Sequence, residues 1–250
     1  MEVATVDKMC GFSSVLTLAK RTLSQFIESP IIYVVAVFFY GFVGFVFGIN
    51  YFMGNQVSIE GIGQISVWVL WFVVPAVTMG LVSEELRTGT FEQLATLPIE
   101  DWQIVVGKFL GFAGLSFLLV GGLVFYPLVL SFTAQPHLGL ELGPTLGVLA
   151  GLYFLMLFFG AMGLFASSLT KSQVVSFILG TVFCTLFFFV GQFTSVFPGV
   201  LARVADFVGV MSHLSTLARG VWDFRDVLYF VSGTGLFLYF AIQRLTTRRF

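Results

Sequence analysis

Long stretches without a charged residue alternate with short polar segments along the whole chain. A helix that crosses a bilayer needs about 20 apolar residues, with a working range of roughly 17–25. Six uncharged runs reach that length, at residues 29–59, 61–83, 109–140, 142–170, 172–202 and 227–243. Each run can hold one span and none comfortably holds two, so the pattern predicts six transmembrane helices.

The apolar centres of these runs define the expected limits of the helices. We expect spans at residues 31–53, 65–82, 109–133, 145–169, 174–197 and 227–243. No low-complexity linker or separate soluble domain interrupts them. The predicted fold class is therefore all-α, a polytopic membrane protein that forms one membrane-spanning domain over residues 1–250.

Residues 12–29, before the first span, show apolar positions at three- and four-residue spacing. A helix with one apolar and one polar face lies in the membrane interface rather than across the membrane. We therefore expect an N-terminal amphipathic interfacial helix that ends where Ser29-Pro30 interrupts it. Its expected apolar face consists of Phe12, Leu16, Ala19, Leu23, Phe26 and Ile27.

The segment between the second and third spans, residues 84–108, is too polar to lie in the membrane. Gly89 is suited to end one helix, and Thr90-Phe91-Glu92-Gln93 has the pattern of a capping box that starts a short helix over 91–97. Asp101 then follows where the positive end of the third helix dipole favours a carboxylate. The sequence predicts a compact elbow here rather than a loose linker.

Residues 198–226, between the fifth and sixth spans, combine an apolar stripe with scattered charges. This pattern predicts two short helices at the outer interface, the second of them capped by Ser212. By contrast, residues 170–173 between the fourth and fifth spans predict a tight inner turn. The outer stripe consists of Val200, Leu201, Val204, Phe207, Val208 and Met211.

Composition supports membrane insertion and narrows the range of partners. The 250-residue chain is 58% hydrophobic and 10% charged, with a formal net charge of −1, whereas soluble domains carry about 25% charged residues. The chain has no basic patch, so we do not expect it to bind nucleic acid. The lipid bilayer is the expected partner. The two cysteines, Cys10 and Cys184, lack the spacing of metal ligands, so we expect no metal site.

The distribution of Lys and Arg predicts the orientation, because these residues accumulate on the cytoplasmic side of a membrane. Six spans place both termini on one side. With the N-terminus inside, only three of the twelve basic residues lie outside, namely Arg203, Arg219 and Arg225. We therefore expect a multi-pass membrane protein with both termini in the cytoplasm.

The residue types argue against several kinds of chemistry. The predicted spans lack the ionisable groups that ion-coupled transporters need, and the chain has no phosphate-binding loop. Glu84-Glu85 and Arg87 are too closely spaced for the paired-glutamate motif of intramembrane proteases, and both histidines, His137 and His213, fall in outer segments. We expect no enzyme and no catalytic residue, so a partner must supply any energy.

Four stretches of the chain are distinctive as a set. The first is the elbow run Glu84-Glu85-Leu86-Arg87-Thr88-Gly89-Thr90-Phe91-Glu92-Gln93-Leu94, and the others lie at residues 28–34, 163–173 and 213–230. In this order they resemble the permease subunits of type-2 ABC exporters, and within that group the gliding-motility-associated permease. The resemblance covers nearly the whole chain.

This resemblance implies a six-helix permease that pairs with a second permease, identical or related, above two cytoplasmic ATPase subunits. ATP and Mg²⁺ are then bound by those ATPases, and this chain needs no cofactor of its own. In such exporters the elbow contacts the ATPases and the short outer helices help to form an external gate. The implied ATPase-coupling residues are Glu84, Glu85, Arg87, Gly89, Thr90 and Glu92, and the implied gate or partner residues are His213, Arg219, Asp223 and Asp226.

Simpler interpretations of both residue sets stay open. The elbow charges are also typical of a solvated helix end with weak local ion pairs. The outer charges are also typical of an interfacial helix whose charged side chains pair with one another. For the whole chain, the alternative to export is a non-transporting mechanotransmitter that couples a cytoplasmic ATPase to an envelope or periplasmic partner. The resemblance also admits an accessory protein with a large extracytoplasmic domain.

Overall fold

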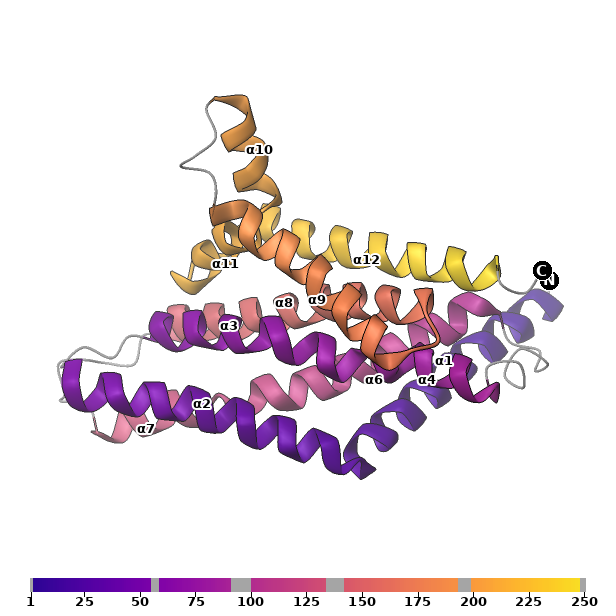
Figure 1. Cartoon of the computed structure of the whole chain (residues 1–250), viewed down its shortest axis with the longest axis horizontal. Helices are drawn as coiled ribbons and strands as arrows, with labels where there is room; N and C mark the ends of the chain where they lie inside the picture. Colours follow the sequence, from indigo (N-terminus) through magenta and orange to yellow (C-terminus); the bar gives the residue numbers. More distant parts are fainter. Residues whose placement is uncertain (1, 55–58, 91–99, 134–141, 193–198, 248–250) are drawn as a thin grey trace.

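The computed structural model describes residues 2–54, 59–90, 100–133, 142–192 and 199–247. In these ranges every extended regular element is an α-helix, which confirms the all-α prediction (Figure 1). The helices are α1 Glu2–Glu28, α2 Pro30–Gly54, α3 Ile59–Thr78, α4 Gly80–Thr88, α6 Asp101–Gly122, α7 Phe125–Thr133, α8 Leu142–Leu169, α9 Gln173–Val190, α10 Val200–Val208, α11 Val210–Ala218 and α12 Phe224–Thr246.

Six helical segments of the described chain are long and apolar enough to cross a membrane, as predicted. They are Pro30–Ile49, Gly61–Thr88, Asp101–Val129, Gly143–Leu169, Gln173–Val190 and Phe224–Thr246. The second segment extends well past its expected limit, and the third begins earlier than expected. The reason is that the helices continue into polar sequence, where hydrogen bonding is maintained after the apolar run has ended.

The helices pack around α8, which is the most buried of the six spanning segments. The helices α3, α6, α9, α11 and α12 all contact α8, and its central residues Leu152, Leu155 and Phe159 have no exposed surface. Figure 1 shows both chain termini together at one end of the bundle, beside the end of α4, whereas α10 and α11 lie toward the other end. An even number of spans explains why the termini share a side.

The N-terminal amphipathic helix is longer than expected and packs against the bundle. It runs from Glu2 to Glu28, and the helix is interrupted at Ser29 as predicted. Val15, Ala19 and Thr22 are buried against α6, where a side chain at Gly111 would collide with Thr22. Contact between these small residues therefore decides which face is covered, and the interfacial position of the helix stays a prediction.

Two of the spanning segments are interrupted inside the bundle. The third segment breaks between α6 and α7 at Leu123, four residues before Pro127, which has no N–H to donate to the Leu123 carbonyl. The second segment breaks at Met79, four residues after Pro75. At the first break the Tyr126 N–H donates to the Leu123 carbonyl at 3.1 Å instead. The second break leaves N–H groups at the start of α4 that the bilayer cannot satisfy.

At the second break, the missing partners come from a neighbouring helix. The Ser167 hydroxyl of α8 accepts hydrogen bonds from the backbone N–H groups of Val82 and Ser83 at 3.0 and 2.9 Å. The same hydroxyl donates to the Met79 carbonyl at 2.9 Å. One side chain on α8 thus caps the first turn of α4, where N–H groups lack intrahelical partners.

We expect Ser167→Ala to lower the free energy of unfolding by about 1–2 kcal/mol, because interhelical hydrogen bonds in membranes contribute up to that amount. The measurement is the unfolding midpoint of the full chain in detergent. Ser168→Ala is the matched control, since Ser168 is equally buried but, within the described part of the chain, its hydroxyl donates to Phe165 of its own helix rather than to another helix. Equal losses in the two variants would show that the cross-helix cap does not stabilise the break.

Candidate functional sites at the two ends of the bundle

The end of α4 carries the first group of predicted site residues. Gly89 has φ of 75° and terminates the helix, so it ends a helix as the sequence predicts. Glu84, Arg87 and Thr90 are exposed. Glu92 and the short helix expected over 91–97 lie outside the described residues. The exposed charges on α4 itself are therefore Glu84 and Arg87, which lie before and after Glu85 in the sequence.

Glu85 is engaged inside the protein. Its carboxylate lies 2.6 Å from the ammonium group of Lys108 on α6, and the exposed side-chain fractions are 24% and 7%. The Lys108 ammonium also donates to the Leu81 carbonyl. Breaking such a buried pair costs far more than breaking an exposed one, because the remaining charge stays desolvated. Glu85 therefore fixes α4 to α6.

The sequence analysis assigned Glu85 to ATPase coupling and did not identify Lys108 as its partner. A signal was present, because Lys108 is the only Lys or Arg between Arg87 and Lys171. Apart from Arg87, it is therefore the only cation in the elbow sequence that could pair with its carboxylates. Asp101 is buried at the start of α6, in agreement with the expected carboxylate at that helix end.

The outer segment forms two short helices, α10 and α11, as predicted. The second helix begins at Val210 with Gly209 at its cap position, so the expected cap at Ser212 is wrong. The Ser212 hydroxyl instead donates to the Asp206 and Gly209 carbonyls at 2.7 and 2.9 Å. The glycine provides the extended backbone that the chain needs to start the second helix directly after the first.

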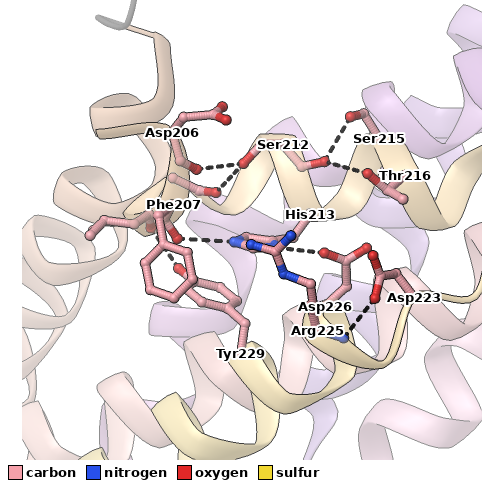
Figure 2. Close-up of polar contacts among 12 residues, drawn as sticks. Asp206, Phe207, Ser212, His213, Ser215, Thr216, Asp223, Arg225, Asp226 and Tyr229 are labelled. Carbon is pink, nitrogen blue, oxygen red and sulfur yellow. Dashed lines mark hydrogen bonds and ion pairs between the residues drawn. The ribbon is translucent and has the colours of Figure 1, made fainter. Parts of the chain in front are cut away.

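His213 of α11 and Asp226 of α12 form the centre of this segment (Figure 2). The imidazole Nδ1 lies 2.6 Å from the Asp226 Oδ1, and both side chains are about nine-tenths buried. The other ring nitrogen, Nε2, lies 2.9 Å from the Phe207 carbonyl at the end of α10. His213 therefore connects three helices.

The partners of His213 determine how many protons the pair holds. A carbonyl oxygen only accepts, so Nε2 must carry a proton. The contact at Nδ1 then requires a second proton, either on Nδ1 facing a carboxylate or on Asp226 facing a neutral ring. In both forms the pair is neutral overall, which limits the cost of burying it.

Aromatic rings enclose the pair. Tyr229 stacks on the imidazole with ring centres 4.1 Å apart and an interplanar angle of 16°, and its hydroxyl donates to the Val208 carbonyl at 2.6 Å. Figure 2 shows the Phe207 and Tyr229 rings on the same side of His213. This enclosure makes His213 and Asp226 structural partners of each other, with little surface left for a ligand.

The side chains of the other two predicted residues have different hydrogen-bond partners from this pair. Asp223 caps α12 by accepting from the Arg225 N–H at 2.9 Å. The Arg219 Nε donates to the Ser215 carbonyl at 3.2 Å, and its side chain is exposed. The structure thus joins His213 with Asp226 and leaves Arg219 accessible. Among the described residues, no group of three His, Cys, Asp or Glu side chains is placed to hold a metal ion.

Comparison with known proteins identifies the family to which the sequence is similar. Residues 11–222 match a family model described as ABC-2 family transporter protein. The match includes the end of α4, both short outer helices and every spanning segment except the last. A search of curated proteins gives no significant match.

We expect a double-mutant cycle of His213→Ala and Asp226→Ala to give a coupling energy of about 2 kcal/mol, the size of a hydrogen bond to a charged group. The cycle is measured by unfolding of the full chain in detergent. A parallel cycle of His213→Ala with Asp223→Ala is the control, and its coupling should stay under about 0.5 kcal/mol. Equal coupling in both cycles would contradict the specific pair.

Proposed function

The chain belongs to the ABC-2 transporter family, and from this premise we propose that it moves a substrate outward across the bacterial inner membrane. As a member of that family it is a permease subunit of an ABC transporter, a multi-pass membrane component that works with an ATPase subunit. The proposed arrangement has two cytoplasmic ATPases, which bind ATP and Mg²⁺, below this chain and a second permease that is identical or related. Both termini lie in the cytoplasm.

The observation that carries the coupling proposal is the fixed end of α4. Glu85 ties α4 to α6 through Lys108, and Ser167 of α8 caps the start of the same short helix. Glu84 and Arg87 stay exposed on it. A force applied to these two charges therefore acts on α6 and α8 together, which suits a rigid-body transition of the bundle.

The positions of the charged residues support an external energy source. Lys108 and Asp101 lie in the first turns of α6, and Asp226 lies in the first turn of α12. All three are nearer to helix ends than to mid-membrane, where proton and ion relays place their charges. ATP hydrolysis by a partner is therefore the proposed source of energy.

The narrower assignment is to the gliding-motility-associated permeases, with an accessory protein that has a large extracytoplasmic domain. Its support comes from the distinctive sequence stretches, two of which make specific contacts. The stretch at 163–173 contains Ser167, and the stretch at 213–230 contains His213, Asp226 and Tyr229. These residues thus connect different helices of the bundle.

The coupling role is tested by exchanging two exposed charges, in the double variant Glu84→Lys with Arg87→Glu. We expect recovery of the copurifying ATPase, and ATP hydrolysis by the complex, to fall about tenfold, which corresponds to about 1.4 kcal/mol of lost contact. The unfolding midpoint should not change, because neither side chain is buried.

Lys171→Glu is the control for this exchange, since Lys171 is exposed in the turn that precedes α9 at the same end. This variant should keep normal ATPase recovery. Full recovery and activity in the exchanged variant would contradict contact through α4. If the unaltered chain brings down no ATPase at all, the proposed function itself fails.

Orientation is tested with single cysteines in a chain where Cys10 and Cys184 are replaced by Ala. A membrane-impermeant maleimide added to intact cells should label Arg225→Cys and leave Thr88→Cys and Ser172→Cys unlabelled until the cells are opened. All three native side chains are exposed, so burial does not explain a difference. Labelling of Thr88→Cys in intact cells would invert the proposed topology.

A further inference from the structure

A cavity of about 260 Å³ lies between the outer helix α11 and the spanning helices beside it. The helices that border it are α3, α8 and α11, together with the residues that follow α9. It is separate from the enclosed His213–Asp226 pair, since neither residue lines it. Its lining residues are Gly63, Gln64, Val148, Leu152, Gln192, Met211, Leu214, Ser215, Ala218 and Arg219.

The walls of the cavity are held in place by close contacts between α11 and α8. A side chain at Gly147 would collide with the Leu217 carbonyl, and one at Gly151 would come within 2.9 Å of Leu214. The two helices therefore approach closely only because these positions lack a Cβ. A ligand site with such walls is largely preformed, which reduces the cost of binding.

The lining is divided into an apolar part and a polar part. Val148, Leu152 and Leu214 are almost fully buried within the bundle and supply an apolar wall. Gln64, Gln192 and Arg219 are exposed polar residues at the edge. Gln64 lies near the start of α3 and Gln192 follows the end of α9. The polar edge is therefore at the level of the helix ends, and the apolar wall leads inward.

The charge of this edge is positive. Among the described residues that line the cavity there is no carboxylate, and Arg219 is the one charged side chain. Within the described part of the chain, the hydrogen bond of Arg219 uses Nε, so the two terminal nitrogens of the guanidinium remain available as donors. A guanidinium binds a carboxylate or a phosphate with paired hydrogen bonds.

We propose that this cavity binds an amphiphile with one anionic head group, held by Arg219, and an alkyl chain against Val148, Leu152 and Leu214. The head group is a carboxylate or a phosphate. The two glutamine amides complete its hydrogen bonding, and the position of the polar edge at the helix ends matches the head-group level of a bilayer. Binding at this site does not depend on the direction of transport or on an ATPase.

The test uses the full chain in nanodiscs of neutral lipid, with a photoactivatable 12-carbon alkyl carboxylate as the probe. The matched probe is the alkyl alcohol of the same length. We expect the carboxylate to label peptides from residues 59–78 and 210–219 at lower concentration than the alcohol. In Arg219→Gln the carboxylate should lose about tenfold in apparent affinity and approach the alcohol, whose labelling is unchanged.

Three variants control this result. Arg203→Gln removes an exposed outer arginine on α10 that does not line the cavity, and it should leave labelling unchanged. Ser215→Phe fills the cavity and should block both probes, whereas Ser215→Ala loses the same hydroxyl contact without filling space. Equal affinity of the two probes, or an unchanged carboxylate affinity in Arg219→Gln, would overturn the proposal.

Competition identifies the source of the head group. Phosphatidylglycerol that displaces the probe, when phosphatidylcholine does not, indicates an anionic bilayer lipid. Displacement only by unlabelled alkyl carboxylate indicates a single-chain amphiphile. If phosphatidylcholine competes as well as both anionic compounds, charge recognition by Arg219 is wrong.

Discussion

A bilayer core contains no water, so each backbone N–H and C=O within it must find a partner in the protein. This constraint is strictest where a spanning helix breaks. At Met79 the protein meets it with one hydroxyl from α8, which caps the next turn and closes the broken end. Because that turn is the first turn of α4, the same hydrogen bonds also connect the exposed charges of α4 to α8 at the centre of the bundle.

The second consequence of the lipid surroundings is that helices do not associate by excluding water, so close packing has to hold them together. Glycines provide it at the main crossings. A side chain at Gly163 would collide with Thr78 beside the break, one at Gly111 with Thr22 of α1, and one at Gly147 with the carbonyl of Leu217. The large aromatic side chains then fill the remaining space around α8, as Phe158 and Phe159 do.

The sequence was sufficient to predict what depends on local pattern. The charge-free runs predicted six spans, Ser29-Pro30 predicted the break before α2, and Gly89 predicted the end of α4. Contacts between distant residues were not predictable in this way. Such contacts depend on how the helices cross, and each side chain could pair with several others by residue type alone. The examples are Glu85 with Lys108, Ser167 with Met79, and His213 with Asp226. Ser212 was assigned as a cap because serine favours that position, but Gly209 already provides the required backbone.

The two ends of the bundle use their charges differently, and the difference determines which surfaces remain for other molecules. At the end where α4 stops, Glu85 is paired with Lys108, while Glu84 and Arg87 are exposed. At the end that carries α11, Asp226 is paired with His213, while Arg219 lies at the edge of a cavity. A buried pair can fix a helix without offering a contact, and an exposed charge can offer a contact only if the helix beneath it is fixed. The buried pairs therefore position the exposed charges, so the contacts that we propose for Glu84, Arg87 and Arg219 depend on residues that lie inside the protein.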